Sequence, residues 1–229
     1  APENTLAAFR LGHAHGYRMA ETDVKLSADG VAFLLHDATL ERTTSGIGRA
    51  DALTWRDLAQ LDAGSWHSPP YAGEPLPTLA SIARWTRAND MAVNLEIKPT
   101  PGRERETGAA VALDAKTLWA SSDVKPLLSS FSEDALDAAR EAVPELPRAW
   151  LIERMPEDWR TTLVRLGCIA LDAKHSLLTR ELVTEVRSAG LRVATWTVND
   201  PARAAELASW GVDTIITDAV DVIAADSLK

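Results

Sequence analysis

The sequence predicts a (β/α)8 barrel, the TIM-barrel fold of the α/β class, and three observations support this. Short β-branched or apolar segments alternate with longer amphipathic segments along all 229 residues, as is typical of βα units around a parallel sheet. Seven barrel strands can be counted, and eight close such a barrel. The chain also starts on a helical segment, so we expect the first strand before Ala1. This organisation predicts a single domain over residues 1–229, incomplete at its N-terminus.

A helix and a hairpin are expected at the N-terminal end. Pro2 favours a helix that begins beside it and runs through residues 3–10, because the missing N–H of proline costs nothing in a first turn. The segments 18–25 and 31–35 both have the composition of strands. They are joined through Ser27-Ala28-Asp29-Gly30, a turn too short for a parallel crossover. We therefore expect an antiparallel hairpin, of which one strand belongs to the barrel.

The rest of the chain alternates between strands and helices, and several helices carry start or stop signals. A Ser, Thr or Asp side chain before a helix can accept hydrogen bonds from its free N–H groups. A glycine after a helix can adopt the left-handed conformation of a C-cap. The predicted strands are 92–97, 126–130, 147–152, 168–172, 192–198 and 213–217; the predicted helices are 54–62, 78–89, 104–119, 133–142, 157–166, 179–189 and 201–209; the start signals are Thr78, Ser132, Thr179 and Asp200; and the stop signals are Gly190 and Gly211.

Residues 38–77 interrupt this alternation. The segment lacks a strong strand, contains paired Thr43-Thr44 and Pro69-Pro70, and exceeds the length of an ordinary loop. Because insertions of this kind usually serve a site, we expect a small insertion with a functional role at about 38–77.

The composition argues against several classes of partner. Lys and Arg number 24 against 33 Asp and Glu, a net charge of −9, which makes nucleic acid a poor partner. No apolar run approaches the ~20 residues of a membrane span, so we expect no membrane insertion. The single Cys168 permits no intrachain disulfide and favours a reducing compartment. Assembly into a homo-oligomer stays open.

Acidic side chains stand at the ends of two predicted barrel strands. Glu21-Thr22-Asp23 ends one strand, and the alternation of side chains places both carboxylates on one face. Glu96-Ile97-Lys98 ends the next barrel strand, and His36-Asp37 closes the hairpin. Three carboxylates at one end of a barrel repel one another unless a hard cation lies between them. The sequence therefore predicts a site for one divalent cation, Mg²⁺ or Ca²⁺.

Each of these motifs also has a structural interpretation. Acids at strand ends are usually solvated, and His36-Asp37 alone could form a turn and a helix cap. Lys98 could hold a phosphate oxygen, and a histidine can transfer the proton that phosphodiester cleavage requires. Phe131 and Trp196 could line a pocket, although core positions would explain them equally well. The joint placement of the motifs after consecutive strands favours a site.

Taken together, these motifs resemble those of the glycerophosphodiester phosphodiesterase family. Their order and spacing fit over all 229 residues. Asp62-Ala63-Gly64-Ser65-Trp66 most resembles the bacterial cytosolic enzymes linked to glycerol-3-phosphate uptake, which implies a cytoplasmic location. The stretches that carry the resemblance are Ala1-Pro2-Glu3-Asn4-Thr5, Glu21-Thr22-Asp23-Val24-Lys25, Leu35-His36-Asp37, Asn94-Leu95-Glu96-Ile97-Lys98-Pro99, Leu128-Ser129-Ser130-Phe131, Trp196-Thr197-Val198-Asn199 and Gly211-Val212-Asp213-Thr214-Ile215-Ile216-Thr217-Asp218.

The resemblance implies metal-dependent hydrolysis of glycerophosphodiesters to glycerol 3-phosphate and an alcohol. In the family the first strand ends in a His-Arg-Gly motif, which this sequence lacks. A second catalytic histidine and a phosphate-binding arginine are therefore expected upstream of Ala1. Carried over by position, the roles are metal binding for Glu21, Asp23 and Glu96, acid/base catalysis for His36, and substrate binding for Lys98, Phe131 and Trp196.

Two other functions are compatible with the sequence. A related barrel enzyme would cleave lysophospholipids or sphingomyelin, but the sequence shows no basic amphipathic helix for docking on lipid. A barrel that binds glycerophosphodiesters without cleaving them is conceivable because one catalytic histidine is absent from the sequence.

Overall fold

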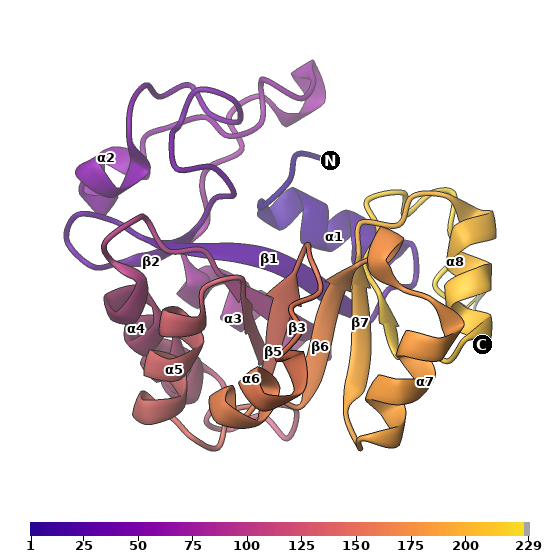
Figure 1. The fold of residues 1–229 in the computed structure, drawn as a ribbon. Coiled ribbons are helices and arrows are strands. Elements are labelled where there is room, and N and C mark those ends of the chain that lie inside the picture. The colour runs from indigo at the N-terminus through magenta and orange to yellow at the C-terminus, as the bar shows by residue number, and fades with distance from the viewer. Residues whose placement is uncertain (227–229) are drawn as a thin grey trace.

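Within residues 1–226, the part that the structure describes, the protein forms one curled sheet of eight strands with helices on its outer side (Figure 1). The structure is a computed structural model. The strands are β1 (Met19–Leu26), β2 (Ala32–Leu34), β3 (Ala92–Ile97), β4 (Leu127–Ser130), β5 (Arg148–Ile152), β6 (Ala170–Lys174), β7 (Arg192–Trp196) and β8 (Thr214–Ile215). The helices are α1 (Leu6–Ala14), α2 (Trp55–Leu58), α3 (Leu79–Ala88), α4 (Glu104–Leu118), α5 (Glu133–Ala142), α6 (Trp159–Leu166), α7 (Arg180–Ser188) and α8 (Pro201–Ser209), with short 3-10 helices η1 (Ala50–Ala52), η2 (Pro69–Tyr71) and η3 (His175–Leu177).

Neighbouring strands run parallel everywhere except at one edge of the sheet. The strand order is β2-β1-β3-β4-β5-β6-β7-β8, and every pair from β1 with β3 to β7 with β8 is parallel. Helices connect successive parallel strands and cover the convex face of the sheet (Figure 1). This arrangement confirms the predicted α/β fold of the TIM-barrel type.

The predicted hairpin is confirmed at the edge of the sheet. β1 and β2 pair antiparallel, with Val24 opposite Leu34. Gly30 in the connecting turn has a φ of +80°, a conformation that glycine adopts without a steric penalty. Only β1 of this pair contacts a parallel strand, and in that register Asp23 lies opposite Glu96.

The helix start and stop signals are also confirmed. The hydroxyl of Thr78 accepts a hydrogen bond of 3.1 Å from Ser81 N, and Asp200 Oδ1 accepts one of 2.8 Å from Ala202 N. Gly190 follows α7 with a φ of +79°. Ser132 and Thr179 cap their helices in the same way, and Gly211 follows α8 with a φ of +90°.

The first helix starts later than Pro2 suggested. Helix α1 begins at Leu6, and Thr5 is its N-cap, with a hydroxyl that accepts a hydrogen bond from Ala8 N. The residue before the cap, Asn4, has a φ of +55° and directs its side chain to β1. The prediction was wrong here because a contact with a distant strand, rather than proline, determines the backbone at this end.

Residues 38–77 form the expected insertion, seen in Figure 1 as the violet segment that rises near the N-terminus. It contains η1, α2 and η2 and has a small apolar core of its own, in which Leu40 and Leu58 are fully buried beside Phe33 of β2. The carboxylate of Asp62 fixes one of its loops by accepting hydrogen bonds from backbone N–H groups, including Gly64 N at 2.7 Å. The insertion is thus a packed structure.

Apolar side chains fill the space between the sheet and the helices. One cluster joins the first strands to α3, α4 and α5, and another joins the later strands to α6, α7 and α8. Polar side chains that are buried within strands, such as Asn94, Glu96, Ser129 and Asp172, line the cavity on the inner side of the sheet. Among the described helices, none combines the length and apolar character required to cross a bilayer.

Candidate active site

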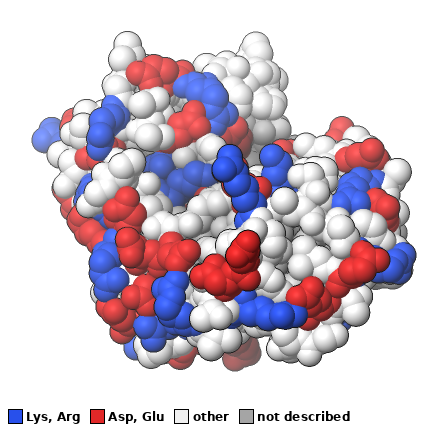
Figure 2. Space-filling model, viewed as in Figure 1, with Lys and Arg blue, Asp and Glu red and all other residues white. Residues whose placement is uncertain are grey.

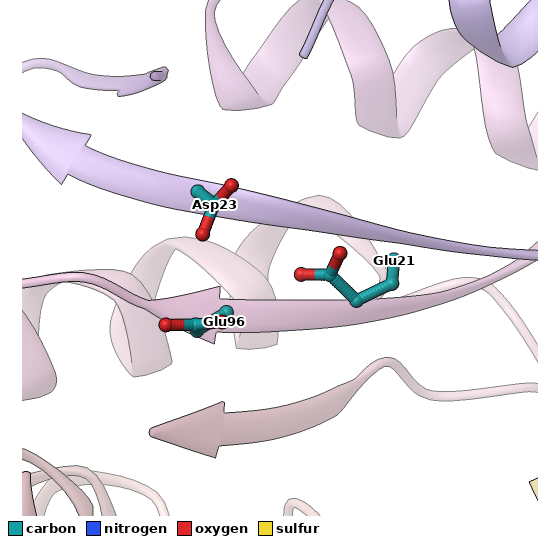
Figure 3. A group of neighbouring side chains, drawn as sticks. All are labelled: Glu21, Asp23 and Glu96. Atoms are coloured by element: carbon teal, nitrogen blue, oxygen red, sulfur yellow. The ribbon is translucent and has the colours of Figure 1, made fainter. Parts of the chain in front are cut away.

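Three carboxylates from two neighbouring strands meet on the inner side of the sheet. Glu21 and Asp23 project from β1, and Glu96 projects from β3 (Figure 3). One oxygen atom from each side chain lies within 4.8 Å of the other two. The parallel register places Asp23 beside Glu96, and the two-residue repeat of a strand returns Glu21 to the same face. The structure thus brings together the three residues that the sequence singled out.

Burial makes this group of carboxylates unfavourable without a cation or protons. Burial raises the pKa of Glu21 well above its ordinary value, and the charges of Asp23 and Glu96 raise it further. Burial likewise raises the pKa of Glu96, with a further contribution from Asp23. Glu21 Oε1 is buried and has no hydrogen-bond partner among the described residues. Oxygen ligands of this kind fit a hard divalent cation, which would satisfy the buried oxygen and offset the mutual repulsion.

Asn4 holds one member of the triad in place. Its Nδ2 donates a hydrogen bond of 2.8 Å to Asp23 Oδ2. Its Oδ1 accepts from Asp23 N at 2.9 Å and from the hydroxyl of Thr22 at 2.5 Å. A short polar side chain that precedes α1 therefore fixes both the backbone and the carboxylate of β1 at the site.

Lys98 lies at the edge of the triad and contacts three of the site's side chains. Its Nζ is 2.9 Å from Glu96 Oε1 and 3.2 Å from Asp23 Oδ1. Burial lowers the pKa of Lys98, but the charges of Asp23 and Glu96 outweigh this effect and raise the pKa overall. Lys98 is therefore a cation at neutral pH. Its positive charge can attract an anion to this cavity in a protein of net charge −9.

The contacts of His36 define its tautomer. Lys98 Nζ lies 3.0 Å from His36 Nε2, and an ammonium can only donate, so Nε2 accepts and the ring is neutral in this arrangement. The proton is then on Nδ1, which donates a hydrogen bond of 2.8 Å to Asp37 Oδ1. This assignment follows from the hydrogen-bond partners. It leaves Nε2, the nitrogen that faces the site, able to take up a proton.

A residue of the insertion holds the partner of His36. Arg42 donates to Asp37 through Nε at 2.6 Å and Nη2 at 3.1 Å. The same guanidinium makes two hydrogen bonds, of 2.8 Å and 2.7 Å, to the carboxylate of Glu3. The hydrogen bonds from Arg42 hold the pKa of Asp37 well below its ordinary value. The insertion therefore supports the site through an ordered chain from Glu3 to Arg42, Asp37 and His36.

Two aromatic rings stand beside Lys98. Phe131 and Trp196 pack edge to face, with ring centroids 5.4 Å apart, and Lys98 Nζ lies 5.8 Å from the centroid of Phe131. Both rings line the same open cavity of about 1730 Å³ as the carboxylates and His36. Phe131 is 41% exposed, so its position is not explained by packing in the core alone. Figure 2 shows the molecule hollowed near the middle of the face drawn there, with basic side chains beside the hollow.

Sequence reasoning missed three residues that the structure brings to the site. Asn4 lies in a stretch that carries the family resemblance but was assigned no role, and Arg42 carries no local signal; the partners of both are far along the chain. Asp172 does have a signal, since it is the one acid in the apolar stretch from Ile169 to Ala173. It lines the cavity and is fully buried.

Comparisons of the sequence and of the structure with known proteins point to the same family. Residues 1–222 match the sequence model of the glycerophosphoryl diester phosphodiesterase family. A glycerophosphodiester phosphodiesterase of Caldanaerobacter subterraneus subsp. tengcongensis is 31% identical over 222 residues, which cover 95% of this chain and 88% of that protein. The structure of an Oleispira antarctica phosphodiesterase in complex with the product sn-glycerol-3-phosphate has a TM-score of 0.91 at 35% identity, covering 97% of this chain and 90% of that one. The glycerophosphodiester phosphodiesterase of Agrobacterium tumefaciens has a TM-score of 0.81 at 29% identity, covering 98% and 94%.

Proposed function

The chain belongs to the glycerophosphoryl diester phosphodiesterase family and is a phosphoric diester hydrolase, and from this premise we propose that one divalent cation, held by Glu21, Asp23 and Glu96, is required for its activity. One observation carries the proposal. Three carboxylate oxygens lie within 4.8 Å of one another, and the buried Glu21 Oε1 has no partner among the described residues. The ligand chemistry suits Mg²⁺ or Ca²⁺. A cation bound there would stabilise negative charge on the phosphoryl oxygens.

Lys98 is proposed to bind a phosphate oxygen. An ammonium carries three donors, and in this structure those of Lys98 face Glu96, Asp23 and His36. All three partners line the cavity, so a phosphate oxygen that enters it can replace one of them. The fixed positive charge of Lys98 then stabilises the charge that gathers on the phosphoryl group during reaction.

His36 is proposed as one acid/base group. Its Nε2 faces the cavity as an acceptor, while Asp37 and Arg42 hold the opposite side of the ring. The ring can therefore take a proton from an attacking oxygen or return one to a leaving oxygen at Nε2. The complementary proton transfer requires a second acid/base group. The attacking oxygen belongs either to water or to a glycerol hydroxyl of the substrate, which would give a cyclic phosphate first.

Phe131 and Trp196 are proposed to flank the glycerol part of the substrate. Their edge-to-face contact leaves apolar ring surface beside the ammonium of Lys98. The Oleispira antarctica relative holds sn-glycerol-3-phosphate, which supports glycerophosphodiesters such as glycerophosphocholine or glycerophosphoethanolamine as substrates here. The cytoplasmic location and the single domain over residues 1–229 stay predictions.

The test is an assay of glycerol 3-phosphate release by the full-length protein. Activity should disappear when a chelator removes divalent cations and should return when Mg²⁺ or Ca²⁺ is added in excess. The cation that restores the larger kcat/KM identifies the preferred metal. Full activity in the presence of chelator would refute the metal requirement.

A further inference from the structure

Besides Glu96, whose Oε1 is paired with Lys98, and Trp196, four polar side chains inside the barrel carry buried atoms without hydrogen-bond partners among the described residues. They come from four strands, β1, β3, β4 and β6, and all line the same cavity. We call them the inner polar cluster: Glu21, Asn94, Ser129 and Asp172. The atoms concerned are Glu21 Oε1, Asn94 Oδ1, Ser129 Oγ and both carboxyl oxygens of Asp172.

Asp172 is the unusual member of this cluster. The residue is 0% exposed, and its neighbours on β6 are Leu171 and Ala173, which are also fully buried. Burial raises the pKa of Asp172 to about 8, and the negative charge of Glu96 contributes to this rise. An ionised carboxylate without solvent, a cation or a hydrogen-bond donor is costly inside a protein. In the metal-free protein, burial therefore favours the protonated form of Asp172, which has one O–H group that can donate.

The other charged groups of the site give a second reason for a neutral Asp172. A negative charge on Asp172 raises the pKa of Glu21, and the charge of Glu96 on β3 raises the pKa of Asp172. A divalent cation together with Lys98 would balance the three carboxylates of the triad. A fourth ionised carboxylate would leave an excess of negative charge where an anionic phosphodiester must enter.

Water molecules are suited to link the members of the inner polar cluster. Buried waters usually make about three hydrogen bonds to polar groups that would otherwise lack partners. The cluster offers five such atoms, and Asp172 and Ser129 can each donate as well as accept. Groups that hydrogen-bond to metal ligands commonly fix the orientation of those ligands.

We propose that Asp172 is a positioning residue that holds Glu21 in its metal-binding orientation through water molecules bound in the inner polar cluster. The proposal rests on the proposed cation site at Glu21, Asp23 and Glu96. Asp172 itself does not touch the substrate. Its effect is on the affinity for the cation, and through it on the concentration of active enzyme.

Two substitutions of Asp172 test the proposal, with calorimetric titration of Mg²⁺ or Ca²⁺ into metal-free protein near pH 7. Asp172→Asn keeps the size, the neutral charge and one donor, so its Kd should stay within about 3-fold of that of the parent protein. Asp172→Leu keeps the size but removes all hydrogen bonding, so its Kd should rise about 10- to 100-fold. The kcat of Asp172→Leu should recover at a saturating cation concentration. Thermal denaturation of each variant confirms that it is folded, and Asp172→Ala replaces the leucine variant should that one fail to fold.

A matched control removes a buried hydrogen bond from the opposite face of a neighbouring strand. The hydroxyl of Thr195 on β7 donates to Ala173 O at 2.6 Å, while Ala194 and Trp196 on either side line the cavity. Thr195→Val should therefore leave the Kd for the cation unchanged.

The outcomes separate this proposal from the one on which it rests. If the parent protein binds no cation, the metal site and the role of Asp172 both fall. If the parent protein binds and Asp172→Leu binds equally well, only the positioning role falls. A Kd for Asp172→Asn as weak as that for Asp172→Leu would mean that Asp172 acts as an ionised ligand, which also overturns the proposal.

Discussion

Asn4 Nδ2 donates a hydrogen bond of 2.8 Å to Asp23 Oδ2, and so a residue before the first helix orients a carboxylate of the proposed metal-binding triad. Asn4 Oδ1 also accepts a hydrogen bond from Asp23 N. Asn4 therefore holds the backbone of β1 as well as the carboxylate. The pairing explains why Asn4 adopts a φ of +55°, a conformation that asparagine tolerates better than most residues.

We predict that Asn4→Ala weakens cation binding by about 10- to 100-fold, because Asp23 loses the donor that fixes its carboxylate. Titration calorimetry measures the Kd. Asn89→Ala is a matched control, since Asn89 Nδ2 donates to Trp85 O and neither residue lines the cavity. Equal affinities for the Asn4 variant and the control would show that Asp23 needs no support from Asn4.

Arg42→Ala should lower kcat about 10- to 100-fold with little change in the affinity for the cation. The variant loses both hydrogen bonds to Asp37, so His36 is no longer held in one orientation, and small displacements of a catalytic group are costly. Arg49→Ala is the control, because Arg49 lies in the same insertion and pairs with Asp51 instead. A kcat that falls equally in both variants would point to a general loosening of the insertion.

His36→Ala should reduce kcat about 10²- to 10⁴-fold, the usual effect of removing an acid/base group. The Kd for the cation should be retained, because the hydrogen-bond partners of His36 are Lys98 and Asp37 and not the carboxylates of the triad. Steady-state kinetics at saturating cation is the measurement. A variant with nearly normal kcat would remove His36 from the mechanism.

Divalent cation should raise the melting temperature of the metal-free protein. A ligand that binds only the folded state adds about 2.7 kcal/mol to the free energy of unfolding at a concentration of ~100 Kd. Glu96→Gln removes one ligand charge and should abolish most of this shift. Thermal denaturation with and without cation measures the shift in melting temperature independently of activity. An undiminished shift in Glu96→Gln would mean that the cation binds elsewhere.

The metal-free protein should become less stable as the pH rises from about 4 to about 8. Burial raises the pKa of Asp172 from its ordinary value of 3.8 to about 8 in the folded protein. Between these values the folded state keeps a proton that the unfolded chain has lost, so the free energy of unfolding falls with rising pH and levels off above the folded pKa. Asp172→Asn should show a weaker pH dependence of its melting temperature in chelator. The same pH dependence in the variant and the parent protein would contradict this.

Local sequence patterns determined most of the architecture. Alternating apolar segments, capping residues such as Thr78 and glycines such as Gly190 marked the elements, because hydrophobic periodicity and backbone preference act over a few residues. The two-residue repeat of a strand likewise suffices to place Glu21 and Asp23 on one face, because it is a property of the extended backbone alone.

Only the tertiary structure decided what supports and surrounds those carboxylates. Asn4 meets Asp23 across 19 positions of the chain, and Arg42 meets Glu3 across 39. No local pattern encodes such pairs, because they form only when the parallel register and the insertion bring the segments together. The protonation of Asp172 depends likewise on complete burial, which many distant side chains create jointly.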